Sequence, residues 1–259
     1  FGANFIGRMS GKVVEAFVAK ADLLAASPAY SDQSGVDWKT AAASAAKVLN
    51  HIGGVDGMDP TGWTWYCNVD DIEKLSPTES PAEILWRGER AKSLSLEEDN
   101  FPPTLYGNGR INPTQNLVDA FPMLNGYPVS HLSGEYDENL PYANRDPRLE
   151  AYILYNGCKA GNTNKEIFTA ADGTTNDALN KVVGRSTRTG YYLRKLLRQD
   201  ISLDPNAKAD QYHYTPRIRY TEIFLAYAEA ANQAYGPQDK GGNGYSAYDV
   251  VKKLRHPAG

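Results

Sequence analysis

The sequence predicts a mainly α-helical protein, in which helical hairpins support long irregular loops and a small β region. Two segments, one near each end of the chain, repeat apolar residues at three- and four-residue steps, which predicts amphipathic helices. The stretch between them lacks this period, which predicts loops. With 259 residues, 41% of them hydrophobic and 22% charged, the chain has the composition of a soluble globular protein. We therefore expect residues 1–259 to form a single domain.

The first helical hairpin is predicted over residues 11–52. Ser10 is an N-cap type of residue and Pro28 ends the first helix. The apolar positions of this helix are Val13, Val14, Phe17, Val18, Ala21, Leu24 and Ala25. A second helix opens after Asp37, carries an alanine-rich face, and ends at Gly53-Gly54. The short polar loop between the two helices predicts an antiparallel pair.

Residues 53–215 are predicted to form a loop and small-β region. Glu83–Arg87 reads as a short strand, and Pro113–Phe121 as a short helix. Asn125-Gly126 is a tight turn signal. Two further segments, 149–155 and 190–196, are rich in strand formers, and the polar stretch between them is expected to be an exposed hairpin.

A second helical hairpin is predicted over residues 216–255. One helix begins after Pro216, and a shorter one begins near Ser246. Phe17–Asp22 aligns with Phe224–Glu229, so the two hairpins look like copies of one unit. Small residues facing aromatic residues are the packing pattern of tetratricopeptide-type repeats.

Charge and motif content exclude several classes of protein. The formal charge is −4 and the basic residues form no block, which argues against nucleic acid as a partner. No apolar run approaches the ~20 residues of a membrane helix. Four histidines and two cysteines show no metal-ligand spacing, and no nucleotide-binding or hydrolase motif occurs, so we expect no metal, no cofactor and no enzyme activity.

The order of several motifs resembles that of the SusD-like (RagB/SusD) nutrient-binding lipoproteins of Bacteroidetes outer membranes. The matching stretches are Ala25–Pro28, Asp37-Trp38, Pro113–Phe121, Arg145–Leu149, Thr189–Lys195, Arg217–Ile223, Tyr227–Ala230 and Val250–Arg255. The family's lipoprotein signal and acylated cysteine have no counterpart here, and a typical member is longer at both ends. The chain is therefore expected to be a fragment or a processed chain that lacks the family's N-terminal part.

The resemblance implies a non-catalytic protein that binds an oligosaccharide or polysaccharide at the cell surface. It implies delivery of that glycan to a SusC-like TonB-dependent transporter, and attachment to the outer membrane through a lipid anchor that this chain does not carry. Two alternatives stay open: a glycoside hydrolase that uses a carboxylate pair, and a tetratricopeptide-type scaffold that binds a protein.

Two segments are candidates for the glycan site, because saccharides are bound by aromatic planes and by planar amide, carboxylate or guanidinium groups. The first is the cluster Trp63, Trp65, Tyr66 and Asn68. If this segment is extended, both tryptophans lie on one side, roughly 6.6 Å apart; alternatively, they fill the core of a loop. The second is the glycine-containing segment with Tyr106, Asn108 and Arg110, whose alternative reading is an ordinary turn.

Overall fold

The computed structural model describes residues 7–62 and 80–255. Its contacts divide the chain into two compact units. Among the described residues, the helical unit comprises 7–62, 80–90 and 214–255, and the loop unit comprises 91–213. The single domain expected over residues 1–259 stays a prediction.

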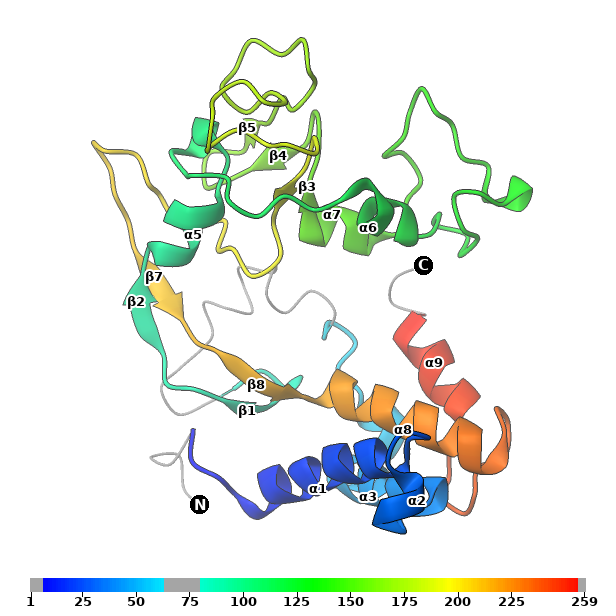
Figure 1. Cartoon of the computed structure of the whole chain (residues 1–259). Coiled ribbons are helices and arrows are strands. Elements are labelled where there is room, and N and C mark those ends of the chain that lie inside the picture. Colours follow the sequence, from blue (N-terminus) through cyan, green and yellow to red (C-terminus); the bar gives the residue numbers. More distant parts are fainter. Residues whose placement is uncertain (1–6, 63–79, 256–259) are drawn as a thin grey trace. The chain divides into compact units, whose positions relative to one another are not determined.

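The helical unit contains both predicted hairpins together with one antiparallel strand pair (Figure 1). Its elements are α1 (Gly11–Ala26), α2 (Ser31–Ser34), α3 (Trp38–Asn50), η2 (Gly54–Gly57), β1 (Ile84–Arg87), β8 (Pro216–Arg219), α8 (Tyr220–Tyr235) and α9 (Ala247–Arg255).

The loop unit consists of short helices and short strand pairs joined by long connections (Figure 1). Its elements are β2 (Ala91–Ser93), α5 (Ser95–Asn100), η3 (Pro103–Leu105), α6 (Gln115–Ala120), η4 (Leu132–Gly134), α7 (Pro147–Tyr152), β3 (Ile153–Leu154), β4 (Lys159–Ala160), β5 (Lys165–Glu166), β6 (Tyr192–Leu193) and β7 (Gln211–His213).

The first hairpin forms as predicted, and side chains cap both of its long helices. The hydroxyl of Ser10 accepts a hydrogen bond from the amide of Val13, and the carboxylate of Asp37 accepts one from the amide of Thr40 at 2.8 Å. These bonds satisfy amides that have no partner within a helix. The alanine-rich face of α3 is buried, which lets α1 and α8 approach it closely.

The buried face of α1 differs from the predicted one. Val13, Ala16 and Ala19 are buried, whereas Val14, Phe17 and Leu24 are exposed. The helix is apolar on two sides, so its period alone did not distinguish the side that packs on α3. The alanine side is chosen because small residues allow the helix backbones to come close together.

The chain from Pro216 begins with a strand, which corrects the predicted helix start. β8 pairs antiparallel with β1, and Ile218 lies opposite Trp86. The predicted strand at Glu83–Arg87 is thereby confirmed, and β-branched Ile218 explains part of the preference for strand at β8. Trp86 packs against the helical core, and its indole nitrogen donates to the carbonyl of Gly7 at 2.8 Å.

The second hairpin, α8 and α9, is confirmed. Phe224 and Tyr227 have no exposed surface, and the hydroxyl of Tyr227 donates to the carbonyl of Tyr245 at 2.7 Å. Ser246 and Asp249 cap the start of α9 reciprocally, each side chain accepting from the other's amide. The core of this unit therefore lies where α1, α3, α8 and α9 meet.

The predicted strand at 149–155 is wrong over its first half. Asp146 caps a short helix there and Pro147 occupies its first turn, so residues up to Tyr152 are helical (α7) and only Ile153–Leu154 form a strand (β3). β3 pairs with β6, which confirms the strand predicted in 190–196, and β4 pairs with β5 in the predicted polar hairpin.

Helix α5 and the strand pair of β2 with β7 appear where the sequence predicted irregular chain. α5 begins after Leu94, and no side chain caps it, so the usual start signal is missing from the sequence. β2 pairs with β7, which lies more than a hundred residues later. Pairings of such separation leave little trace in local periodicity.

Candidate functional site

The first predicted glycan cluster lies outside the described residues. Trp63, Trp65, Tyr66 and Asn68 all fall in the range 63–79, so their role as a site stays a prediction.

The described chain reaches this segment at Gly62, which is held by a buried ion pair. The guanidinium of Arg219 donates to Oε1 of Glu83 at 2.9 Å and to the carbonyl of Gly62 at 3.1 Å. Glu83 is 1% exposed, and its carboxylate also accepts from the amide of Thr221. Desolvation raises the pKa of Glu83, although the bonds from Thr221 and Arg219 oppose that rise. The pair fixes the position from which the tryptophan segment departs.

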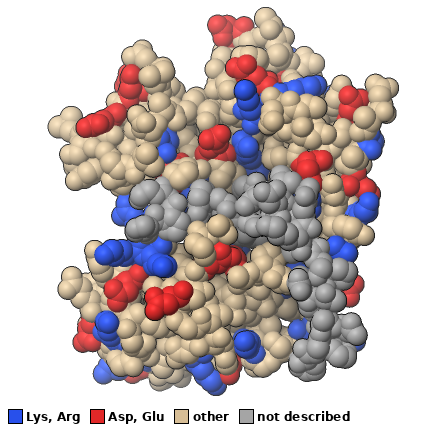
Figure 2. All heavy atoms as spheres, turned by 180° about the vertical axis from the view of Figure 1, so that it is seen from behind, with Lys and Arg blue, Asp and Glu red and all other residues tan. Residues whose placement is uncertain are grey.

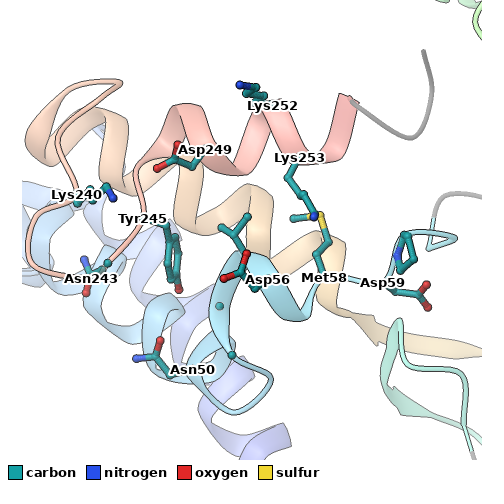
Figure 3. A pocket seen from close by; sticks show the side chains of 15 residues that line it. Asn50, Asp56, Met58, Asp59, Lys240, Asn243, Tyr245, Asp249, Lys252 and Lys253 are labelled. Carbon is teal, nitrogen blue, oxygen red and sulfur yellow. The ribbon is translucent and has the colours of Figure 1, made fainter.

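A pocket of about 810 Å³ opens in the helical unit between η2 and the start of α9 (Figure 3). The side chain of Tyr245 forms one wall, and Figure 3 shows it between α9 and the η2 segment. The amide side chains of Asn50 and Asn243 and the carboxylates of Asp56 and Asp59 also line it.

The lining of this pocket suits a polar, uncharged ligand. Carboxylates are balanced by Lys240, Lys252 and Lys253 on the same lining, so no charge of one sign dominates. The ring of Tyr245 is fixed in place, since its centroid lies 4.8 Å from that of Tyr227 and Gly54 packs directly against it. Amides and carboxylates on a pocket lining can hydrogen-bond the hydroxyls of a saccharide, whereas Tyr245 is 9% exposed and belongs to the core of the helical unit.

Sequence reasoning missed this pocket because its residues were read as helix stops and loops. Gly53 and Gly54 adopt positive φ, as do Gly242 and Gly244. The sequence did offer a signal for the pocket in these glycines. Gly53 and Gly54 follow one helix, and Gly242 and Gly244 directly precede Tyr245. The pocket rim at Asp59 and Pro60 lies a few residues before the tryptophan segment in the chain.

The segment of the second predicted site forms a tightly packed turn. The amides of Asn108 and Arg110 donate to carbonyls of α5 at 2.9 and 3.0 Å. Gly107 and Gly109 are buried, and a Cβ on Gly109 would lie 2.2 Å from the carbonyl oxygen of Arg185. The glycines therefore serve close packing and not mobility.

Charged neighbours engage the side chains of this turn. The ammonium of Lys165 lies 5.6 Å from the ring centroid of Tyr106, and Arg110 pairs with Asp99 at 3.2 Å. Tyr106 and Arg110 are exposed, whereas Asn108 is half-buried. The turn thus presents an aromatic and a guanidinium group on a rigid backbone, and their role in binding stays a prediction.

Three neighbouring acids that could serve the alternative hydrolase reading carry partners in the structure. Glu97 is fully buried against His213, Glu98 pairs with Lys208, and Asp99 pairs with Arg110. Asp70 and Asp71 lie outside the described residues. Within residues 7–62 and 80–255, no group of three or more His, Cys, Asp or Glu side chains is placed to hold a metal ion.

Charges of both signs are interspersed on the face shown in Figure 2. This agrees with the scattered basic residues of the sequence and gives no sign of a surface for a polyanion. Among the helices that the structure describes, none combines the length and apolar character needed to cross a membrane.

Comparison with known proteins identifies the family. A sequence profile of the SusD family matches residues 85–259. A SusD-like carbohydrate-binding protein from Bacteroides fragilis has a similar structure, with a TM-score of 0.69 at 21% identity over 97% of this chain and 45% of that one. A SusD-like protein from the same organism gives a TM-score of 0.69 at 23% identity over 100% of this chain and 49% of that one.

At these identities the structural likeness shows the fold, and the chain spans about half the length of either solved structure, 45% and 49%. A comparison with curated protein sequences finds no significant match. The profile covers more than half of the chain, including the motifs from Pro113 to the end. This chain belongs to the SusD family.

Proposed function

We propose that the protein binds an oligosaccharide or polysaccharide without hydrolysing it. The observation that carries this proposal is the SusD-family match over residues 85–259. The pocket beside Tyr245 supports it, because amides and carboxylates on its lining can hydrogen-bond a saccharide and its residues Asp59 and Pro60 shortly precede the tryptophan segment in the chain.

The bound glycan passes, in this proposal, to a SusC-like TonB-dependent transporter in the outer membrane. The protein acts at the cell surface, held there by a lipid anchor of the full-length protein. Transfer without chemistry needs no nucleophile, metal or tuned acid, and Glu97, Glu98 and Asp99 each form an ion pair.

A binding experiment with the full-length protein tests the proposal. A glycan array identifies ligands, and isothermal titration with each of them gives affinities. The same glycans are then incubated with the protein and assayed for new reducing ends. We expect binding without product release. Reducing ends that disappear on substitution of a single Asp or Glu would favour the glycoside hydrolase instead.

A further inference from the structure

The turn at residues 59–62 supplies one side of the pocket beside Tyr245. Asp59 and Pro60 belong to the pocket lining, and Figure 3 shows Asp59 on the chain that follows η2, past Met58. The amide and the hydroxyl of Thr61 both donate to Oδ1 of Asp59, at 2.9 and 3.0 Å. The position of the Asp59 carboxylate therefore depends on the conformation of this turn.

The turn is attached to the helical unit at its last residue. Pro60 and Thr61 are exposed, whereas Gly62 is buried. The amide of Gly62 donates to the carbonyl of Asp59 at 3.2 Å, which closes the turn. Whatever holds Gly62 in place thus also sets the direction of the pocket side of the turn.

Two charged side chains hold Gly62. Nη2 of Arg219 donates to its carbonyl at 3.1 Å, while Nε of the same guanidinium donates to Oε1 of Glu83 at 2.9 Å. A Cβ added to Gly62 would lie 2.7 Å from Oε2 of Glu83, so the backbone of the turn packs directly on this carboxylate. One guanidinium therefore connects the carboxylate to the turn.

The two charged residues are themselves fixed by the fold. Glu83 is 1% exposed, and its backbone carbonyl accepts from the amide of Tyr220 at 2.9 Å. Ile84 pairs with Arg219 across β1 and β8, and Arg219 is also the N-cap residue of α8. The side of the pocket at Asp59 is thereby tied to the junction between a strand pair and a long helix.

This double contact requires an arginine. A guanidinium presents several N–H groups in a fixed plane, so Nε and Nη2 can bond two acceptors at once. A lysine has one ammonium group at the end of a flexible chain, which can keep the charge beside Glu83 but does not reproduce the geometry of both bonds.

We propose that Arg219 is a positioning residue for saccharide binding, which acts by holding Gly62 and so presenting Asp59 to the pocket. The inference rests on the proposed function, because it concerns affinity for the glycan. A binding group held in place by neighbouring hydrogen bonds loses less conformational entropy when the ligand binds. Loosening the turn should therefore lower affinity although Arg219 does not line the pocket.

The test measures affinity of the full-length protein for neutral oligosaccharides of starch, xylan, mannan and arabinan by isothermal titration, with thermal melting in parallel. Arg219→Lys should lose tenfold or more in affinity for the oligosaccharide that the wild type binds. Arg217→Lys is the matched control, because Arg217 lies on the same strand but is exposed, with its guanidinium 4.5 Å from the ring centroid of Trp86. We expect the control to change affinity by less than twofold.

A double-mutant cycle separates positioning from a general loss of structure. Asp59→Ala should also weaken binding, and the double variant Asp59→Ala/Arg219→Lys should bind no more weakly than Asp59→Ala alone, since both changes remove the same contact. Losses that multiply in the double variant would overturn the inference, as would a wild-type affinity of Asp59→Ala.

Glu83→Gln is a second, milder variant, which decides the question if Arg219→Lys folds poorly. It keeps the shape of the side chain and an oxygen for the guanidinium but removes the negative charge, so affinity should fall in the same direction. Wild-type affinity of correctly folded Arg219→Lys, or of Glu83→Gln, would overturn the inference and leave the proposed function intact. A wild type that binds none of these oligosaccharides and no glycan on an array would overturn both.

Discussion

Nε2 of His213 lies 2.9 Å from Oε1 of Glu97, a carboxylate with no exposed surface. The same oxygen accepts a hydrogen bond from the amide of Arg198 at 2.8 Å, so it joins α5, β7 and the chain that leads into β7. Arg198 in turn pairs with Asp200. The arrangement links distant parts of the loop unit through a histidine, the side chain whose ordinary pKa lies closest to neutral pH.

The pair predicts a pH dependence of stability. Desolvation lowers the pKa of His213, but the hydrogen bond and charge of Glu97 raise it by more, so the net pKa lies above its ordinary value. A raised pKa in the folded state gives stability that is complete below the unfolded value of about 6.5. That stability is lost as pH rises through the folded pKa.

Urea unfolding of the wild type and of His213→Gln between pH 5 and 9 measures this contribution. The wild type should lose stability across that window, and His213→Gln should show a flatter profile. A proton NMR titration of the ring provides the control. A midpoint at or below the ordinary histidine value would contradict the prediction.

The ion pair of Glu83 with Arg219 should be worth far more than an exposed pair. Glu83→Ala leaves a guanidinium that is largely buried without its carboxylate, which costs about 3 kcal/mol of unfolding free energy. Glu222→Ala is the control, because its pair with Lys20 lies at the surface and is worth about 0–1 kcal/mol. Equal losses in urea unfolding would show that Glu83 contributes no more than a surface charge.

Gly109→Ala should destabilise the turn that carries Tyr106 and Arg110. The residue has φ +55°, and the added Cβ would meet a backbone carbonyl at 2.2 Å, so we expect a loss of about 2 kcal/mol or more. Gly11→Ala serves as the comparison, since nothing lies within 4 Å of its Cβ and it stands in a helix. That change should leave stability equal or raise it by up to ~1 kcal/mol. Thermal melting of both variants measures these two changes in stability. A melting temperature for Gly109→Ala equal to that of the wild type would contradict the prediction.

Truncation of the tryptophans distinguishes a binding site from a core. An aromatic anchor in a binding site contributes about 2 kcal/mol or more, roughly thirtyfold in affinity. A Trp that fills a core instead costs ~3–5 kcal/mol of folding stability. We expect Trp63→Ala or Trp65→Ala to lose tenfold or more in glycan affinity while the melting temperature stays near that of the wild type.

Calorimetric titration and thermal melting of each tryptophan variant give the two quantities. If both variants melt early, or both bind normally, the glycan site lies elsewhere. Tyr106→Ala and Arg110→Ala then become the next variants to measure, because both side chains are exposed and their loss should leave the fold intact.

Several features of the fold follow from local sequence. Ser10 and Asp37 cap the helices that they were predicted to cap, because capping needs only a side chain and amides three residues away. The strand at Ile84–Arg87 and the hairpin of α8 and α9 were likewise predicted, since their periods are strong and their ends are marked by Gly or Pro. The ordered motifs also gave the family.

Only the tertiary structure decided which surfaces face inward. Phe17 aligns with Phe224 in sequence, yet Phe17 is 39% exposed while Phe224 is fully buried, because α8 is packed by α1, α3 and α9 whereas α1 buries only its alanine side. The pocket beside Tyr245 likewise needs η2 and the start of α9 to come together from residues almost two hundred positions apart. Periodicity records the chemistry of each helix face, but burial depends on which partner reaches that face, and that is a property of the whole packed chain.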